Sequence, residues 1–376
     1  MSTKETLSAL ILSRLSYFTI PAMRQLLKVA GSFEAVVENR NNIRDIAPDC
    51  PQRIVKALGN IGTIAERAEQ EAEFAASHGI QILALGNERY PQRLMECDDA
   101  PLVLFYKGTA NLNQRRVINI VGTRHATVYA DDCIRTLIED LKQQCPELLV
   151  VSGLAYGVDI MAHRHSLDNG IPTVGVLAHG LDTIYPSAHR ETAVRMVDNG
   201  GLLTEHFTHT NADKVNFVRR NRIVAGMSDA TILVESAAKG GGLITCRMAR
   251  DYNRDVFAFP GRVGDKCSEG CNNLIRDQKA SLITGADDLV KAMMWEADQQ
   301  LATAQKQGIE RNLFPEVDGD QKKIVDALAA NNDQQLNILA QKLQMPISRV
   351  SVSLFELEMK GMVKALAGSV YHLING

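Results

Sequence analysis

The stretch Val117-Ile118-Asn119-Ile120-Val121-Gly122 decides the fold of this chain of 376 residues. It is a short, nearly all-apolar run that stops at a glycine, as expected of a strand buried on both faces. Apolar strands that alternate with helical stretches predict a mostly parallel sheet covered by helices, at whose strand carboxyl ends ligands bind. The predicted strands are 80–85, 102–106, 117–121, 148–151, 173–177, 201–204, 230–234 and 255–259.

Helical segments flank this α/β region on both sides. Leucines and isoleucines at helical spacing, with breaks at Gly31-Ser32 and Pro48, predict a small helical-hairpin (SAM-like) module at the N-terminal end. Such modules contact the nucleic-acid backbone in some proteins and only pack in others, and both roles stay open. After a polar stretch, the C-terminal part predicts three helices and a hairpin, which is the winged-helix arrangement. The expected organisation is a helical module at 1–63, an α/β domain at 64–295, a linker at 296–319 and a winged-helix module at 320–376.

Winged helices often bind duplex DNA through their third helix. In this chain the third helix carries Arg349 and Lys360, but it also carries Glu356 and Glu358. This weak basic balance favours a protein–protein or degenerate role over strong duplex binding.

The composition is that of an ordinary globular protein, with 45% hydrophobic and 23% charged residues. The net charge of −3 argues against binding of polyanions by the whole surface, so any nucleic-acid site must be a local patch. No apolar run reaches the roughly 18 residues that span a bilayer, and the N-terminus lacks a secretory pattern. We therefore expect a cytoplasmic protein with no membrane partner.

The chain has seven cysteines, an odd number, which we expect to be free thiols in a reducing compartment. Three close pairs of residues could bind a metal, but no further Cys or His lies at the spacing that a metal site needs. The sequence therefore predicts no metal site. These pairs are Cys267 with Cys271, His163 with His165, and His206 with His209.

One local basic patch interrupts the mildly acidic chain: Phe217-Val218-Arg219-Arg220-Asn221-Arg222, with Lys214 just ahead of it. We interpret it as a turn followed by a helix start, where free N–H groups already favour anions such as phosphate. A solvated basic helix end with salt-bridge partners is an equally open interpretation. On a helix Arg219 and Arg222 share one face while Arg220 points about 100° away, so at most two of them share a ligand surface. Phe217 is expected to stack on a base or to staple the helix.

Three other strand-end loops carry glycines beside polar groups. Gly122-Thr123-Arg124 offers close backbone approach, a helix cap and a guanidinium for phosphate. Ser152-Gly153, leading to Asp159, suits a tight strand-to-helix turn, with helix–sheet packing as the favoured alternative. Gly240-Gly241-Gly242, followed by Thr245, has the shape of a phosphate cradle but lacks the P-loop lysine. The loops contain no nucleophile–base–acid grouping, so we predict no catalytic residue and no cofactor.

These loops together resemble the DNA-processing protein A (DprA/Smf) family. The resemblance covers roughly residues 80–290 and rests on an ordered series of motifs. They are Val121-Gly122-Thr123-Arg124, Ser152 to Asp159 with Ala162-His163, Gly180-Leu181-Asp182, Tyr185-Pro186, Phe217 to Gly226, Gly242 to Thr245, Pro260-Gly261, and Gly270-Cys271-Asn272 with Leu274-Ile275.

The resemblance implies an extended Rossmann-like, doubly wound domain that binds single-stranded DNA in a cytosolic bacterial protein. It also implies protection of incoming strands during natural transformation, loading of the recombinase RecA onto them, and a homodimer. Two residues depart from the family pattern. Val218 replaces a usual proline, which would make the turn before the helix less rigid, and Gly241 replaces a common serine, which would remove one hydroxyl donor.

The residues predicted to bind single-stranded DNA or phosphate are Gly122, Thr123, Arg124, Ser152, Gly153, Lys214, Phe217, Arg219, Arg220, Asn221, Arg222, Gly240, Gly241, Gly242 and Thr245. Which of the three arginines contact DNA and which brace the fold stays open. The alternative function is a Rossmann-like nucleotide phosphoribohydrolase, because Glu235 precedes a glycine-rich loop. That group places a glutamate after the glycines, however, where this chain has Thr245-Cys246-Arg247. A pure interaction scaffold is the third class.

Overall fold

The computed structural model describes residues 2–15, 20–295, 317, 319–360, 362–366 and 369–374. Two compact units divide the chain, Met1–Glu296 and Ala297–Gly376. Each has a hydrophobic core of its own, so each is described separately. The linker expected at 296–319 lies almost entirely outside the described residues.

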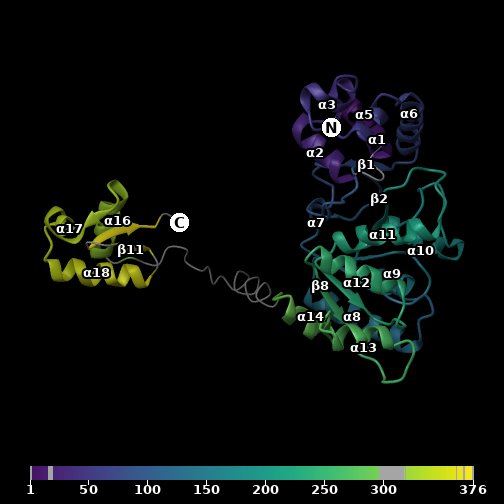
Figure 1. Ribbon diagram of the computed structural model, residues 1–376. Helices are drawn as coiled ribbons and strands as arrows, with labels where there is room; N and C mark the ends of the chain where they lie inside the picture. Colours follow the sequence, from purple (N-terminus) through teal and green to yellow (C-terminus); the bar gives the residue numbers. More distant parts are fainter. Residues whose placement is uncertain are drawn as a thin grey trace. The chain divides into compact units, whose positions relative to one another are not determined.

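The first unit begins with a helical module (Figure 1). Its helices are α1 (Thr3–Leu15), α2 (Ile20–Ala30), α3 (Phe33–Glu38), α4 (Ile43–Ile46), α5 (Gln52–Leu58) and α6 (Gly62–Ser77). The apolar side chains that recur at helical spacing form one core, with Leu10, Met23 and Leu58 fully buried. Because α6 packs against α1, the helical packing continues beyond residue 63. The domain boundaries themselves stay a prediction.

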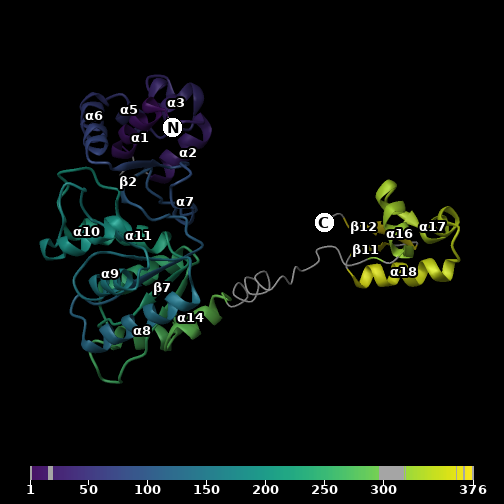
Figure 2. The ribbon, with the colours of Figure 1, turned by 180° about the vertical axis from the view of Figure 1, so that it is seen from behind.

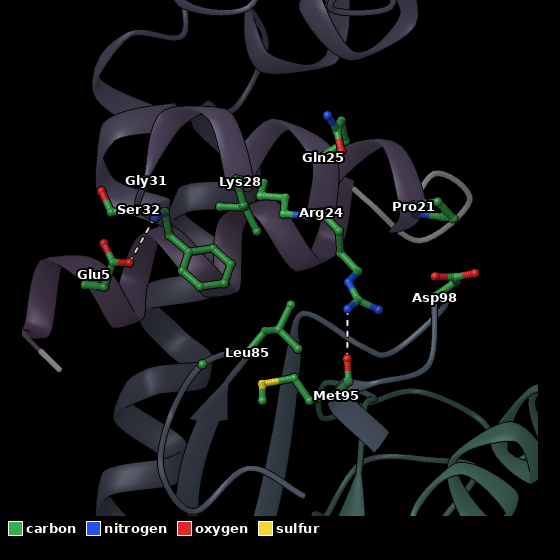
Figure 3. A pocket seen from close by; sticks show the side chains of 13 residues that line it. Glu5, Pro21, Arg24, Gln25, Lys28, Gly31, Ser32, Leu85, Met95 and Asp98 are labelled. Carbon is green, nitrogen blue, oxygen red and sulfur yellow. Dashed lines mark hydrogen bonds between the residues drawn. The ribbon is translucent and has the colours of Figure 1, made fainter. Parts of the chain in front are cut away.

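An arginine of the helical module forms hydrogen bonds with the α/β part. Arg24 of α2 donates to the carbonyl oxygen of Met95 at 2.8 Å and to that of Cys97. Figure 3 shows this side chain reaching from α2 towards Met95, above a pocket of about 520 Å³ that lies beneath α2. Since the guanidinium is used by backbone carbonyls and Glu5 and Asp98 also line this pocket, it is a poor site for a polyanion.

The sheet of the α/β part has the strand order β1-β2-β6-β5-β4-β3-β7-β8-β9. At one edge, β1 pairs with β2 and β2 pairs with β6, and both pairs are antiparallel. All the other neighbouring strands of the sheet are parallel. The strands are β1 (Gln81–Ala84), β2 (Val103–Gly108), β3 (Arg116–Val121), β4 (Leu148–Ser152), β5 (Thr173–Val176), β6 (Gly200–Thr204), β7 (Ala230–Leu233), β8 (Asp255–Ala258) and β9 (Ser281–Leu282).

Side chains that alternate along the central strand β3 enter two different cores, one on each face of the sheet. Val117 and Val121 of β3 lie in one core, whereas Ile118 and Ile120 lie in the other. The first face is covered by α7 (Gln92–Met95), α11 (Lys214–Gly226), α12 (Gly241–Asp251) and α13 (Glu269–Arg276). The second is covered by α8 (Val128–Gln144), α9 (Val158–Asp168) and α14 (Ala286–Ala292), of which α8 and α14 lie side by side in both views (Figures 1 and 2).

The remaining elements of this part are the 3-10 turn Ser187–His189 and α10 (Arg190–Asp198), which packs against β6. The doubly wound, mostly parallel sheet is confirmed, and each of the eight predicted strands is present within two residues at either end. β9 escaped prediction because it has only two residues, both exposed, and therefore no apolar run.

Two local expectations are wrong. Residues 217 and 218 do not form a turn, because α11 already begins at Lys214, where the side chain of Asp213 accepts a hydrogen bond from the Asn216 N–H at 2.8 Å. Val218 therefore lies inside the helix and loosens no turn. Thr123 does not cap the next helix, since α8 begins at Val128; its hydroxyl accepts from the His125 N–H at 3.2 Å instead.

The second unit is a winged helix, as expected (Figure 1). It contains α16 (Gly319–Ala330), β10 (Gln334–Gln335), α17 (Leu336–Leu343), α18 (Ile347–Met359), β11 (Val363–Leu366) and β12 (Val370–Leu373), with the strand order β10-β12-β11. Its core includes Ile324, Leu328, Leu339, Leu354 and Leu357. Across both units, none of the helices that the structure describes is long and apolar enough to cross a membrane.

Candidate nucleic-acid interface

A pocket of about 600 Å³ opens at the carboxyl ends of β3, β4 and β7, beside α11. The chain leaves β3 towards β4 on one side and returns to β7 on the other, so this is the point where the strand order reverses. We call it the strand-end pocket. Its lining residues are Val121, Gly122, Thr123, Arg124, Gly153, Ala155, Tyr156, Asp159, Lys214, Phe217, Val218, Arg220, Asn221, Val224, Ala237, Lys239, Gly240, Gly241, Ile244 and Thr245.

Backbone hydrogen bonds tie the three strand-end loops to one another. The Thr123 N–H donates to the Glu235 carbonyl at 2.8 Å, and the Val158 N–H donates to the Thr123 carbonyl at 3.2 Å. Glycine permits this approach, because a Cβ on Gly122 would lie 2.5 Å from a Val158 methyl group. The three loops therefore form one continuous rim.

Arg220 lies at the bottom of the pocket, only 4% exposed. Its guanidinium donates to the carbonyl oxygens of Gly153 and Val176. Burial lowers the pKa of Arg220 to about 10, while the nearby carboxylate of Asp159 opposes that shift. The guanidinium stays charged near neutral pH, and its charge is held at the floor of the pocket by these two carbonyl oxygens and by the nearby carboxylate.

Asp159 is the buried counter-charge of Arg220. Burial raises the pKa of the Asp159 carboxyl, and the Arg220 charge and the Ala155 N–H at 3.3 Å act in the opposite direction. Both side chains press on Gly153, where an added Cβ would lie 2.4 Å from the guanidinium and 2.5 Å from the carboxylate. Residue 153 must therefore be a glycine, because the Arg220 and Asp159 side chains leave no room for a Cβ atom there, whether or not a ligand is bound.

Phe217 lies between the two arginines that line the pocket. The Arg124 guanidinium carbon lies 5.0 Å from the ring centroid and that of Arg220 lies 5.9 Å from it, which are cation–π distances. The ring of Tyr185 is tilted beside it at 6.0 Å between centroids. The Phe217 ring therefore lines the pocket and positions Arg124 there, in addition to any packing role at the start of α11.

The rim of the pocket carries exposed cations and a helix start. Arg124, Lys214 and Lys239 are exposed on three different loop or helix ends. α12 begins at Gly241, its N-cap residue Gly240 provides no side-chain cap, and both glycines line the pocket. Free N–H groups at a helix N-terminus and exposed cations are the donors that phosphate groups bind.

Four of the predicted residues lie outside the strand-end pocket. Ser152 is fully buried and its hydroxyl donates to the Ile120 carbonyl at 2.6 Å. Gly242 packs against β7, where an added Cβ would lie 2.7 Å from Leu233. Arg222 forms a buried ion pair with Glu205, and Arg219 is half-buried on α11 without lining the pocket.

The structure separates the three arginines, whose roles the sequence left open. Arg220, which helix geometry directs away from Arg219 and Arg222, is the arginine that lines the pocket. Helix spacing fixes the directions of the three side chains relative to one another. It does not fix which face of α11 looks towards the strand ends, since that depends on how the helix packs on the sheet.

Several lining residues escaped prediction although they adjoin the predicted motifs. Lys239 directly precedes the three glycines, and Tyr156 lies between Gly153 and Gly157 with its side chain 50% exposed. An exposed lysine and an exposed tyrosine inside glycine-rich strand-end loops are the signals that could have identified them.

Glu235 does not project into the pocket. It is 2% exposed, and its two carboxylate oxygens accept from the Thr127 N–H at 2.9 Å and the Thr127 hydroxyl at 2.6 Å, which caps the start of α8. His163 is likewise fully buried, with Nδ1 2.7 Å from the Thr173 hydroxyl. In the part of the chain that the structure describes, no group of three or more His, Cys, Asp or Glu side chains could hold a metal ion.

Comparison with known proteins gives the family of the chain. The family model described as DNA recombination-mediator protein A matches residues 81–294, and that of the DprA winged helix domain matches residues 312–369. The chain is 37% identical over 223 residues to DNA processing protein DprA of Streptococcus pneumoniae, which covers 59% of this chain and 77% of that protein. It is 31% identical over 301 residues to Protein Smf of Escherichia coli, and the match covers 78% of this chain and 77% of that protein.

Two solved structures resemble this one along much of their length. The X-ray structure of DprA from Streptococcus pneumoniae superposes with a TM-score of 0.64 at 30% identity, covering 77% of this chain and 98% of that chain. The second is the structure of DNA processing protein A from Helicobacter pylori, which is described for its single-stranded DNA binding mode. It superposes with a TM-score of 0.52 at 28% identity and covers 58% of this chain and 96% of that chain. The chain belongs to the DNA recombination-mediator protein A family, whose members are the DprA and Smf proteins.

Proposed function

We propose that the strand-end pocket binds the sugar–phosphate backbone of single-stranded DNA. The observation that carries the proposal is the convergence of Arg124, Lys214 and Lys239 on one rim, above the buried charge of Arg220. These cations come from loops far apart in the sequence of an acidic chain, so their convergence favours a ligand with negative charge. The Helicobacter pylori relative, described as a single-stranded DNA binder, supports DNA as that ligand.

A flexible strand suits the pocket better than a duplex does. Phosphates would bind the exposed cations and the N–H groups at the start of α12, with no contact that depends on base identity. Displacement of Arg124 from the Phe217 ring by a phosphate would free an aromatic face for an unpaired base, a contact worth roughly 1–3 kcal/mol. Binding by these groups is tolerant of sequence and sensitive to salt.

The wider role is that of a recombination mediator in the cytoplasm. We propose that the protein protects incoming single strands during DNA uptake and loads a RecA-type recombinase on them, acting as a homodimer. Family membership supports this role. An enzymatic role as a nucleotide phosphoribohydrolase has less support, because the Glu235 carboxylate is used to cap α8 and does not line the pocket.

Arg124→Ala provides the test. We expect the affinity for single-stranded oligonucleotides to fall about tenfold whatever their sequence, since a phosphate contact carries no sequence information. The slope of log affinity against log salt concentration should flatten by about 0.7 for each phosphate that the variant no longer neutralises. Fluorescence anisotropy over a salt series measures both quantities.

The matched control is Arg135→Ala, which removes an exposed arginine of α8 that pairs with Asp132 and Glu139. This variant should bind like the unmodified chain. Unchanged affinity and unchanged salt slope in Arg124→Ala would contradict the assignment of the pocket. Release of base from AMP or GMP by the unmodified protein would favour the enzymatic alternative instead.

A further inference from the structure

The third helix of the winged-helix unit exposes a stripe of large apolar side chains. Val352 is 59% exposed, Phe355 63% and Met359 76%, although the opposite face of α18 is fully buried through Val350 and Leu354. A folded unit with a complete core of its own does not need a second apolar face on one helix. Grouped exposure of this kind marks a contact surface.

The spacing of the stripe is that of a coiled coil. Ser348, Val352, Phe355 and Met359 follow one another at intervals of four, three and four residues. A helix surface with this spacing fits the side chains of another helix in a heptad pattern. Duplex DNA is a poor occupant, because Glu356 and Glu358 flank the stripe and would face phosphates.

The charges beside the stripe indicate which helix fits. In the heptad pattern Arg349 and Glu356 occupy the same type of flanking position, one near each end of α18. Arg349 is held by Asp320 with an N–O distance of 2.8 Å and remains 69% exposed, and Glu356 accepts from Gln321 at 2.6 Å. Both charges are thus oriented by α16 rather than free to rotate.

An antiparallel copy of α18 satisfies these charges. Arg349 of each helix would face Glu356 of the other, which gives two symmetric ion pairs, and the small Ser348 would lie opposite the large Met359. A parallel copy would offer Arg349 no carboxylate. We propose that α18 is a self-association surface, on which α18 of a second copy of this chain docks in antiparallel orientation.

The contact is small, and this decides where it operates. Three large apolar side chains per helix bury less than the roughly 1,200 Å² typical of stable interfaces, so this contact by itself holds two free molecules together only weakly. Copies bound beside one another on a single strand raise the effective concentration and make the contact effective. The inference therefore rests on the proposed function, and its consequence is cooperative coating of long single strands.

Phe355→Glu in the full-length protein tests the surface. On strands of about 60 nucleotides, cooperativity should disappear and the Hill coefficient should fall to about 1, whereas binding to a strand of about 15 nucleotides should not change. Ile338→Glu is the matched control, because Ile338 is a large apolar residue that is 51% exposed in the same unit but belongs to α17 rather than to the stripe on α18. Sedimentation equilibrium at high protein concentration gives a measure of pairing that does not involve DNA.

A charge exchange tests the antiparallel second copy. Arg349→Glu and Glu356→Arg should each abolish cooperativity, and the double variant should restore it, because the exchanged charges attract again across the pair. Cooperativity that persists in Phe355→Glu, or that the double variant fails to restore, overturns the proposal. Failure of the unmodified protein to bind even the short strand would contradict the proposed function instead, so the two failures can be told apart.

Discussion

His163 is a buried imidazole that links stability to pH at the scale of one residue. Burial lowers the pKa of His163 to about 3, with the nearby charge of Arg220 acting in the same direction. In the unfolded chain the imidazole has its ordinary pKa of about 6.5 and takes up a proton below it. The folded state therefore loses stability as the pH falls from about 6.5 towards 3.

We expect His163→Gln to make this loss less steep. At its steepest, the free energy of unfolding should change by about 1.4 kcal/mol less per pH unit than in the unmodified chain, which corresponds to one proton. Urea unfolding at a series of pH values measures the slope. An unaltered slope in His163→Gln would show that His163 is protonated in the folded state.

At the scale of the element, the start of α12 offers a position where a substitution can change DNA binding without changing the stability of the fold. Gly241 is the first residue of this helix, and an added Cβ there would meet no atom within 4 Å. In contrast, an added Cβ on Gly240 would lie 2.4 Å from the Ser236 hydroxyl oxygen. A side chain at Gly241 is thus accommodated and lines the strand-end pocket.

Gly241→Asp is expected to weaken single-stranded DNA binding by at least tenfold without destabilising the fold. The carboxylate interacts favourably with the helix dipole, typically by 0.3–1 kcal/mol, but it occupies and repels the phosphate position. Thermal unfolding and anisotropy together measure the two effects. Gly241→Ala should bind almost normally, and equal loss of binding in both variants would mean that the start of α12 contributes shape rather than anion binding.

At the scale of the whole molecule, the two units have separate cores. A chain shortened to residues 1–296 should therefore keep its fold and its affinity for a strand of about 15 nucleotides, while losing the cooperativity that we assign to α18. Circular dichroism and anisotropy on short and long strands test this expectation. Loss of short-strand binding by a folded shortened chain would place part of the binding surface in the second unit.

The elements were predictable because their signals are local. Continuous apolar runs such as Val117–Val121 identify strands buried on both faces, and the glycines that follow identify loops at the strand ends. The start of α11 was not predictable from its cations, because the cap is formed by Asp213 and the buried Asn216, ahead of the basic patch. β9 carried no apolar signal at all.

The amino-acid sequence by itself determined where the main strands and helices follow one another along the chain and which loops hold the cations. Hydrophobic periodicity and glycine positions show this because they act over a few residues. Only the tertiary structure decided that Arg220 faces the pocket while Arg222 pairs with Glu205, and that Glu235 caps α8. The physical reason is that the direction of a side chain depends on where its helix begins and which face the sheet buries. Both are set by contacts between residues that are distant in the chain.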